Sequence, residues 1–139
     1  MDKALNYLAL ARKAGLAELG EEPVGDITRA GKGYLVMVAK DASDHTWRRA
    51  KSYVAGTEQQ CIRMNYTKEE LGFAVGRTSL AIAAITDVAM ALALVNSLGE
   101  PEKYKAVIEV LNFKKAKAKK RQQEAKAHQR NVRMGKVKK

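Results

Sequence analysis

Cysteine is nearly absent from this chain, since Cys61 is the one cysteine among 139 residues. A single cysteine cannot form an internal disulfide, so the sequence predicts a protein of the reducing cytoplasm. Long hydrophobic runs are also missing, because Thr86 and Asp87 interrupt the apolar stretches around them. No stretch approaches the ~20 apolar residues of a membrane-spanning helix. The N-terminus carries Asp2 and has no signal-peptide pattern, so we expect no membrane partner.

The residue groupings typical of enzymes and metal sites are absent as well. Cys61, His45 and His128 do not have metal-ligand spacing, and no Ser/His/Asp or Cys/His nucleophile arrangement is recognisable. The "GKG" at residues 31–33 resembles part of a phosphate-binding loop, but a helical pattern precedes it and an apolar strand pattern follows it. We interpret it as a helix-to-strand turn. The sequence therefore predicts a protein without catalysis, metal or cofactor.

Positive charge is present in excess and is concentrated at one end of the chain. The net charge is +11. Residues 1–113 hold 14 basic and 14 acidic side chains, whereas residues 114–139 hold 12 basic side chains and one acid, so 12 − 1 accounts for the whole excess. Such a segment favours a polyanion, above all nucleic acid. It has few large apolar residues, which argues against a membrane-surface helix.

Hydrophobic periodicity alternates along the chain between helices and short strands. The predicted helices cover residues 2–14, 22–31, 43–54, 67–76 and 87–98. The predicted strands cover residues 16–19, 33–41, 59–64 and 79–86. Ser43 or Asp44 is expected to cap the third helix, and Thr67 with Glu70 forms a capping-box pattern at the fourth. This alternation predicts an α/β fold, a three-layer α/β/α sandwich on a small four-stranded sheet.

A C-terminal basic helix is expected in addition to the sandwich. Gly99 and Pro101 end the alternation, and a new helical stripe follows, formed by Tyr104, Val107, Ile108 and Leu111. Beyond residue 113 the stripe stops but good helix formers continue, so the helix is predicted to reach about residue 128 without a core to cover. We expect disorder from Asn131. These features divide the chain into a domain at residues 1–99 and a C-terminal helix with a basic tail at residues 100–139.

Two loops have sequences that allow more than one interpretation. In "LGEEP", residues 19–23, Glu21 and Glu22 stand in the first turn of a predicted helix. Acidic side chains suit the positive end of a helix, and this structural explanation suffices for the loop taken alone. The second loop, Gly76-Arg77-Thr78-Ser79, joins a short helix to a buried strand and is equally well explained as a plain connection.

A resemblance to a known family favours a functional interpretation of both loops. The stretches "LNYLALARKAG", "LGEE", "YLVMVAKDASDHT" and "ELGFAVGRTSLAIAAITDVAMA" follow one another over residues 3–98. Together they resemble the kink-turn-binding ribosomal protein family, typified by the archaeal large-subunit protein L-seven-Ae, and in particular its small bacterial members of the YlxQ type. The resemblance implies the α/β/α sandwich and a non-catalytic RNA-binding function.

The resemblance also implies which residues meet RNA. Family members grip a kink-turn, a sharply bent RNA stem with tandem sheared G·A pairs and one extruded nucleotide, with two adjacent loops. The matching positions here are Gly20, Glu21, Glu22, Gly76, Arg77, Thr78 and Ser79. A carboxylate accepts hydrogen bonds, and a sheared G·A pair leaves the Watson–Crick edge of guanine, with its N–H donors, free. A glutamate there therefore reads a base.

Cations outside these loops are expected to contact phosphates. Many family members carry a Lys one turn into the helix after the first loop, whereas this sequence has Gly25 and Asp26 there, and Arg29 is the nearest cation. The basic tail lies outside the resemblance, and its phosphate contacts would be independent of RNA sequence. The tail candidates are Lys114, Lys115, Lys117, Lys119, Lys120 and Arg121.

The expected partner is structured RNA, first of all ribosomal RNA, with ribosomal proteins as further neighbours of a chain that is a monomer when free. A ribosome-assembly factor or an accessory subunit of another RNA particle is the alternative. An RNA-processing enzyme is a different class, because related sandwiches carry other chemistries. The absence of paired catalytic groups disfavours it.

Overall fold

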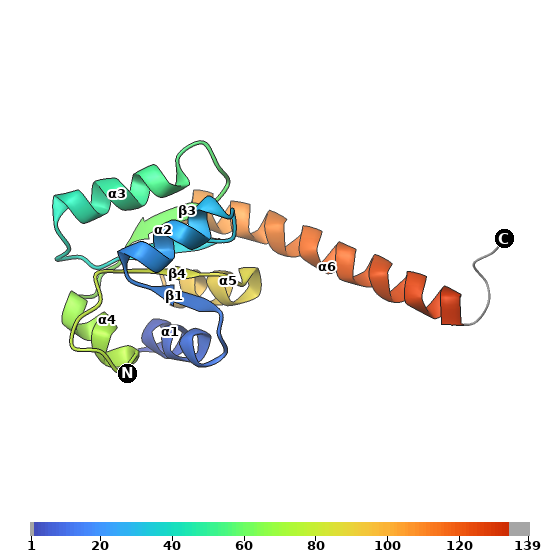
Figure 1. Cartoon of the computed structure of the whole chain (residues 1–139), viewed down its shortest axis with the longest axis horizontal. Coiled ribbons are helices and arrows are strands. Elements are labelled where there is room, and N and C mark those ends of the chain that lie inside the picture. The colour runs from blue at the N-terminus through green and yellow to red at the C-terminus, as the bar shows by residue number, and fades with distance from the viewer. Residues whose placement is uncertain (1, 134–139) are drawn as a thin grey trace.

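The computed structural model describes residues 2–133, with side chains through Gln129. Helices and strands alternate in the predicted order (Figure 1). The helices are α1 (Lys3–Lys13), α2 (Glu21–Arg29), α3 (Asp44–Val54), α4 (Lys68–Ala74), α5 (Val88–Ser97) and α6 (Lys105–Arg133). The strands are β1 (Ala17–Leu19), β2 (Leu35–Val38), β3 (Gln60–Arg63) and β4 (Ile82–Ile85). The α/β class predicted from the sequence is confirmed.

The helices form two layers around the sheet, as the sandwich prediction requires. α2 and α3 contact each other and cover one face, whereas α1, α4 and α5 lie on the other face (Figure 1). Strands β2 and β4 are buried over their full length, since both of their faces are covered. This explains why both read as continuous apolar runs in the sequence rather than as alternating patterns.

The sheet is mixed, and its register determines which loops meet. The strand order is β1-β4-β2-β3, with β4 antiparallel to both β1 and β2 and with β2 parallel to β3. Leu19 pairs with Ala83, and Val38 pairs with both Ile82 and Arg63. The carboxyl ends of β1, β2 and β3 therefore lie at one edge of the sheet together with the start of β4. We call this edge the loop edge.

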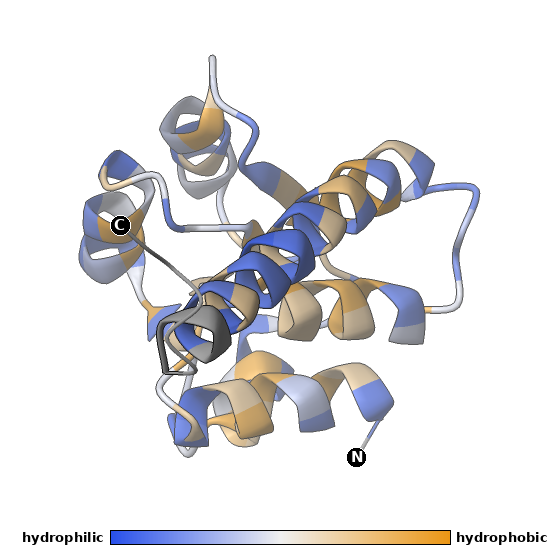
Figure 2. Cartoon of the chain, turned by 90° about the vertical axis from the view of Figure 1, so that its right-hand side faces the viewer, coloured by the Kyte–Doolittle hydropathy of each residue, from blue (hydrophilic) through white to orange (hydrophobic). Residues whose placement is uncertain are grey.

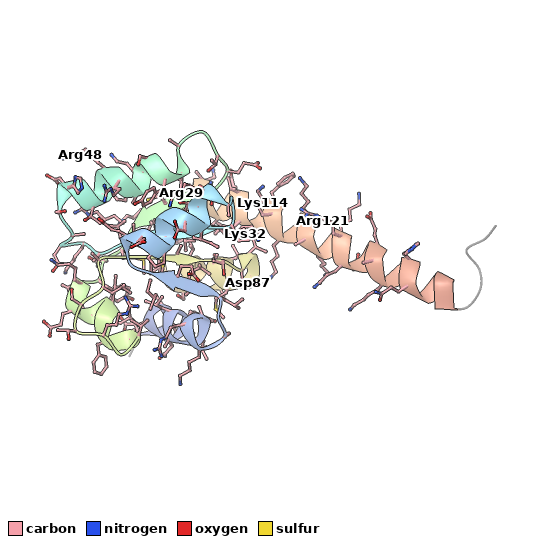
Figure 3. The ribbon with its side chains drawn as sticks, in the orientation of Figure 1. Arg29, Lys32, Arg48, Asp87, Lys114 and Arg121 are labelled. Atoms are coloured by element: carbon pink, nitrogen blue, oxygen red, sulfur yellow. The ribbon has the colours of Figure 1, made fainter. Side chains whose placement is uncertain are left out.

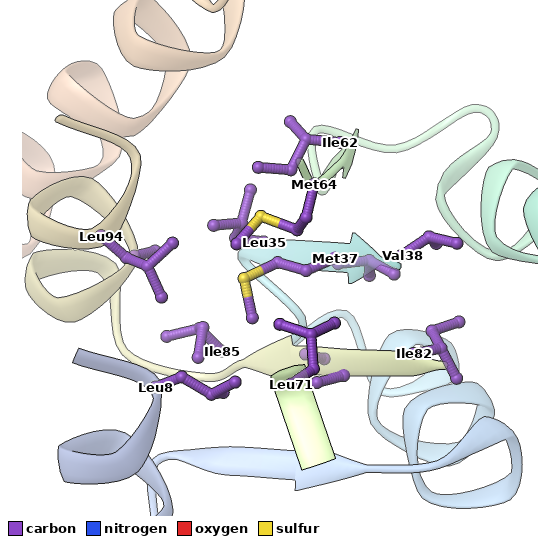
Figure 4. Packing of buried hydrophobic residues seen from close by; sticks show 14 of the residues in the cluster. Leu8, Leu35, Met37, Val38, Ile62, Met64, Leu71, Ile82, Ile85 and Leu94 are labelled. Carbon is purple, nitrogen blue, oxygen red and sulfur yellow. The ribbon is translucent and has the colours of Figure 1, made fainter. Parts of the chain in front are cut away.

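The hydrophobic core lies between the sheet and its helices. Leu8 of α1, Leu71 of α4 and Leu94 of α5 gather against β2 and β4 (Figure 4). These three leucines are fully buried. Each comes from a helix on the same side of the sheet, so that side holds the larger part of the core.

The helix starts agree with the capping signals in the sequence. Ser43 is the N-cap of α3, and its hydroxyl accepts the backbone N–H of Thr46 at 3.1 Å. The predicted capping box at α4 is formed, since Thr67 Oγ1 accepts from Glu70 N and Glu70 Oε1 accepts from Thr67 N. These caps set where α3 and α4 leave the loop edge.

The C-terminal helix is longer and better supported than the sequence predicts. Tyr104 and Leu111 are buried in the common core, 5% and 1% exposed. Ala118 also packs against that core, which corrects the expectation that nothing beyond residue 113 is covered. The reason is α5, which provides a surface for α6. α6 runs to Arg133, past the predicted end near residue 128 and into the segment expected to be disordered, whose remainder, residues 134–139, lies outside the described residues.

Candidate nucleic-acid interface

The two loops singled out in the sequence lie side by side at the loop edge. Because β1 and β4 are antiparallel, the end of β1 is next to the start of β4. The backbone N–H of Gly20 donates to the carbonyl of Ile82 at 2.9 Å. The Arg77 guanidinium nitrogen Nη1 is 4.0 Å from the position that a Cβ on Gly20 would occupy. Residues 20–22 and 76–79 therefore form one surface, which we call the two-loop surface.

Glycine is required at position 20 for the start of α2. Its φ of +97° lies in a region that side-chain-bearing residues rarely adopt. Gly20 is the N-cap and contributes no side-chain hydrogen bond, so the first turn of α2 is not closed by a capping side chain. Glu21 and Glu22 follow directly in that turn, where the partial positive charge of the helix end stabilises acidic side chains.

The structure separates the two glutamates, which the sequence treats alike. Glu21 is half-buried and held by α3: its Oε1 accepts from the Thr46 hydroxyl at 3.2 Å, and its Oε2 pairs with Arg49 at 3.0 Å. Glu22 is exposed and has neither a hydrogen bond nor an ion pair among the described residues. The Glu22 carboxylate therefore keeps its acceptor capacity for donors outside the chain.

The second loop folds back onto the helix before it. Gly76 has a φ of +74°, and the loop is tied down where Arg77 N–H donates to Gly72 O at 2.8 Å and Leu80 N–H donates to Lys68 O at 2.9 Å. The side chains of residues 76–79 remain exposed. The backbone that carries Arg77 is thus fixed while its guanidinium faces solvent.

Gly72 makes this close approach feasible, and the sequence analysis did not identify it as a site residue. A Cβ at position 72 would lie 2.7 Å from the Ser79 nitrogen and 2.8 Å from the Arg77 carbonyl oxygen. The sequence does contain one sign of this role, which is a glycine inside a capped helix. Glycine destabilises a helix relative to alanine, so its presence there suggests that another backbone segment comes close.

An exposed aromatic ring beside Arg77 also escaped the sequence analysis. Phe73 is 77% exposed and lines a hollow together with Leu5, Arg77 and Thr78. Asp2, Glu69 and Glu70 form the acidic rim of the same hollow. A ring and a guanidinium next to each other can both stack on a nucleobase. The signal was Phe73 itself, a large apolar residue off the buried face that Leu71 and Val75 define.

A second hollow lies on the α2–α3 side of the two-loop surface. It is lined by Glu21, Glu22, Gly25, Arg29, Arg49 and Tyr53. Arg29 is exposed and pairs with Asp26 one turn earlier in α2. The Tyr53 ring fills the space above Gly25, 3.3 Å from the position of a Cβ there. Arg49 was not a predicted site residue, because its link to Glu21 spans 28 positions and leaves no local signal.

The basic residues of the C-terminal helix lie away from the two-loop surface. Lys114 Nζ is 2.6 Å from Oε1 of Glu58, and this hydrogen bond and charge lower the pKa of the Glu58 carboxyl below its usual value. Lys115 and Lys119 line a hollow with Asp87. Both are exposed, as are Lys117, Lys120 and Arg121. Glu58 precedes β3 and Asp87 follows β4, so all six lie toward the edge opposite the loop edge (Figure 3).

Cys61 lies in β3, is half-buried and packs against the core. Burial raises the pKa of its thiol to about 12, with the nearby Lys51 acting in the opposite direction. Within residues 2–133 no three His, Cys, Asp or Glu side chains are grouped so as to hold a metal ion. In the same range, none of the helices has the length and hydrophobicity needed to cross a bilayer.

Comparison with known proteins identifies relatives of this chain, although no family model matches it. The RNA-binding protein YlxQ of Enterococcus faecium is 34% identical over 76 residues, which cover 54% of this chain and 72% of that protein. A solved protein of unknown function from Bacillus halodurans aligns with a TM-score of 0.66 and 24% identity, over 72% of this chain and 100% of that one. The Giardia lamblia 15.5kD RNA-binding protein aligns with a TM-score of 0.53 and 20% identity, over 74% and 85%. The two structural likenesses establish a shared fold.

Proposed function

The chain belongs to the family of the RNA-binding protein YlxQ, and from this premise we propose that it binds RNA without catalysis and recognises kink-turns or similarly bent stems. The observation that carries the proposal is the two-loop surface. There a free carboxylate, Glu22, and a cation on an anchored backbone, Arg77, stand on adjacent loops at the edge of the sheet. A bent stem offers base donors and crowded phosphates close together, which is the complement of this pair.

Glu22 is proposed to read guanine. Its two oxygens accept the N1–H and one N2–H of the guanine Watson–Crick edge, which a sheared G·A pair leaves free. The N-terminus of α2 offsets the negative charge of the two glutamates, so the acidic turn does not repel RNA as an isolated pair of acids would. Glu21 has a different role, since it joins α2 to Arg49 and Thr46 of α3 and thereby orients the turn that presents Glu22.

Arg77 is proposed to hold the bent backbone. A guanidinium contacts a phosphate through two parallel hydrogen bonds or stacks on a base, and both modes need a defined position. The bonds from Arg77 N–H to Gly72 and from Leu80 N–H to Lys68 fix the backbone from which the guanidinium extends. Arg29 and Arg49 flank the glutamates and add phosphate contacts on the α2–α3 side.

The cellular target that we propose is ribosomal RNA in the cytoplasm, with a role in translation. An assembly factor or a subunit of another RNA particle would use the same surface and would differ in the RNA that it contacts. Sequencing the RNA crosslinked to the protein in cells separates these roles. Recovery of ribosomal RNA is the expected result, and enrichment of one other RNA would identify the other particle.

The test uses the purified full chain, a labelled kinked stem and a straight duplex of equal length and charge. Glu22→Gln and Arg77→Ala are each expected to weaken the kinked stem more than the duplex, with about 1–3 kcal/mol of discrimination lost for Glu22→Gln. Glu109→Gln and Arg12→Ala remove the same groups from exposed positions and serve as matched controls. Arg12 is near the end of α1, and the segment that follows α1 lies at the edge opposite the loop edge, where Thr86 N–H donates to Leu16 O.

Equal losses on both RNAs, or no loss, would show that the glutamate and arginine are structural. The same incubation tests for catalysis, because the RNA is recovered and its mass measured. Unchanged RNA is expected, and cleaved or modified RNA would identify the protein as an enzyme.

A further inference from the structure

The outer part of α6 is a rod of positive charge that buries almost no side chain. From Lys119 to Gln129 every side chain is exposed except Ala127, which is half-buried. Among the described residues, the one ion pair made by a cation of this helix is that of Lys114 with Glu58. Figure 2 shows hydrophobic residues near the start of α6 and hydrophilic ones along its outer length. Lys117 lies over the Phe113 ring of the same helix, 6.0 Å from its centroid. Without an ion pair to the body in the part of the chain that the structure describes, the cations beyond Lys114 remain available to an external partner.

These cations occupy opposite sides of the helix. At about 100° per residue, Lys117 and Arg121 lie within about 40° of each other, and Lys119 and Lys126 lie on the other side. Lys120 lies between the two groups. A helix that rests on a membrane needs one apolar face, and this segment has none. Charge on both sides of a rod can reach phosphates of both strands at once when the rod lies across an RNA duplex, whose major groove is narrow and bordered by phosphates.

The rod is directed away from the two-loop surface. Tyr104 and Leu111 anchor α6 in the core, and the Lys114–Glu58 pair lies at the edge of the sheet opposite the loop edge. From there α6 continues outward, so the two surfaces point to opposite ends of the molecule (Figure 1). Residues 119–133 extend the helix by roughly 22 Å at about 1.5 Å per residue.

We propose that residues 115–126 of α6 form a second RNA-binding surface that holds a separate double-stranded segment, so that one chain bridges two RNA segments. The proposal rests on the RNA-binding function proposed above. The two surfaces differ in what they recognise. The two-loop surface depends on the shape of a bent stem, whereas α6 neutralises phosphates and is indifferent to sequence.

The experiment measures energy transfer between a donor-labelled kinked stem and an acceptor-labelled straight duplex on addition of the full chain. Transfer is expected with the unaltered protein. A variant with Lys117, Lys119, Lys120 and Arg121 all changed to Gln, a good helix former, should lose transfer and bind the duplex about tenfold or more weakly. Its log-log salt slope for the duplex should fall by about 3 to 4, since about 0.9 counterions are released per phosphate contact. Circular dichroism checks that the helix is retained.

The matched control removes the same charge from the body of the protein. Lys3, Lys13, Lys32 and Lys105 are exposed, and changing all four to Gln should leave transfer intact. Arg77→Ala should reduce transfer by weakening capture of the kinked stem while the duplex stays bound. A mixture of Arg77→Ala with the α6 variant should not restore transfer, because both surfaces must be in one chain.

Several results would overturn the bridging proposal. One such result is that no energy transfer occurs although each RNA binds when it is added alone. Another is that the α6 variant loses affinity for both RNAs equally, which would mean that α6 and the loops bind one RNA together. Restored transfer in the mixture would indicate a dimer, and displacement of the duplex by phosphatidylglycerol vesicles would indicate a membrane partner. If the unaltered protein shows no preference for the kinked stem while the α6 variant still loses the duplex, the proposed loop function fails and the α6 surface stands.

Discussion

At the scale of single residues, the surroundings of a side chain decide what it can do. Glu21 and Glu22 are adjacent and chemically identical, yet Thr46 and Arg49 occupy both oxygens of Glu21. Glu22 remains exposed. The consequence is that Glu21 joins two helices, whereas Glu22 is the side chain that can accept hydrogen bonds from RNA.

Gly72→Ala should displace the loop that carries Arg77. The added Cβ would lie 2.7 Å from the Ser79 nitrogen, a backbone atom that cannot move without the loop. We expect a loss of about 1–3 kcal/mol in the free energy of unfolding, measured by urea denaturation. Gly25→Ala is the control. Its Cβ would lie 3.3 Å from the ring of Tyr53, a side chain that can move, so this substitution should lower the free energy of unfolding less. A Gly72→Ala protein as stable as the unaltered chain would show that the loop relaxes freely.

Cys61 should resist alkylation in the folded protein. The thiolate is the reactive form, and burial raises the pKa of this thiol to about 12. At about pH 8, iodoacetamide should modify the urea-unfolded chain much faster than the folded one. The thiol ionises at lower pH in the unfolded chain than in the folded one. The free energy of unfolding should therefore fall as the pH rises from the ordinary pKa of 9.0 toward 12, and this fall should be smaller in the Cys61→Ala variant. Equal alkylation rates in the folded and unfolded chains would contradict this.

At the scale of elements, α6 is oriented by a small number of contacts. Its first turns are held by Tyr104 and Leu111 in the core, and Lys114 ties the next turn to Glu58. Beyond Ala118 the helix has no further support from the body. The direction of the basic rod thus depends on contacts made within its first four turns.

Glu58→Gln should loosen the outer part of α6. The hydrogen bond and the charge of Lys114 lower the pKa of the Glu58 carboxyl in the folded protein below its usual 4.5. The ion pair therefore stabilises the docked helix at pH values above 4.5, and this stabilisation is lost as the pH falls through the lowered pKa. Energy transfer between dyes on the body and at residue 129 should show a broader distance distribution at low pH in the unaltered protein. The Glu58→Gln variant should show the broader distance distribution already at neutral pH. Glu109 also lies on α6 but makes no ion pair among the described residues, so Glu109→Gln should leave the distance distribution unchanged. A pH-independent distribution would show that Leu111 and its neighbours suffice.

At the scale of the whole molecule, a neutral body carries a charged extension. Residues 1–113 have balanced charge, and the excess of +11 lies beyond them. The body contains the two-loop surface, and the extension leaves from the opposite edge of the sheet (Figure 1). Stability and shape recognition should therefore depend on the first part, and salt-dependent affinity on the second.

Truncation after residue 113 should leave a cooperatively folded protein. Tyr104 and Leu111 are retained, and the losses are confined to Ala118 and the Lys114 pair. The shortened chain should bind every RNA more weakly with a flatter salt dependence and should keep its preference for a kinked stem. Thermal unfolding and affinity titrations at several salt concentrations check both points. Loss of the kink preference would mean that the tail is the recognition element.

Truncation after residue 99 is the informative comparison. It removes Leu111, which is 1% exposed, and Tyr104, which is 5% exposed, and so opens the core beside α5. Deleting one such buried side chain costs about 2–5 kcal/mol, a large part of the stability of a small domain. We expect a marked fall in the midpoint of thermal unfolding relative to the chain that ends at 113. Equal midpoints would place the end of the folded domain at residue 99.

The order of helices and strands, the caps and the charge division follow from the sequence, because they rest on local interactions. Thr67 and Glu70 are three positions apart, and the buried strands β2 and β4 are continuous apolar runs. The two loops stood out in the sequence, and the family resemblance gave them an expected function. The end of α6 was misjudged, because the packing of Ala118 against the core is not visible in a local pattern.

Only the tertiary structure decides which of these pieces meet. Antiparallel pairing of β1 with β4 brings Gly20 to Arg77, and α3 brings Arg49 to Glu21 across 28 positions. Gly72 acquires its importance from the return of the loop over it. Lys114 of α6 meets Glu58, which lies 56 positions earlier in the chain. Periodicity and capping act over a few residues, whereas these contacts join distant segments, so the register of the sheet and the packing of helices determine them.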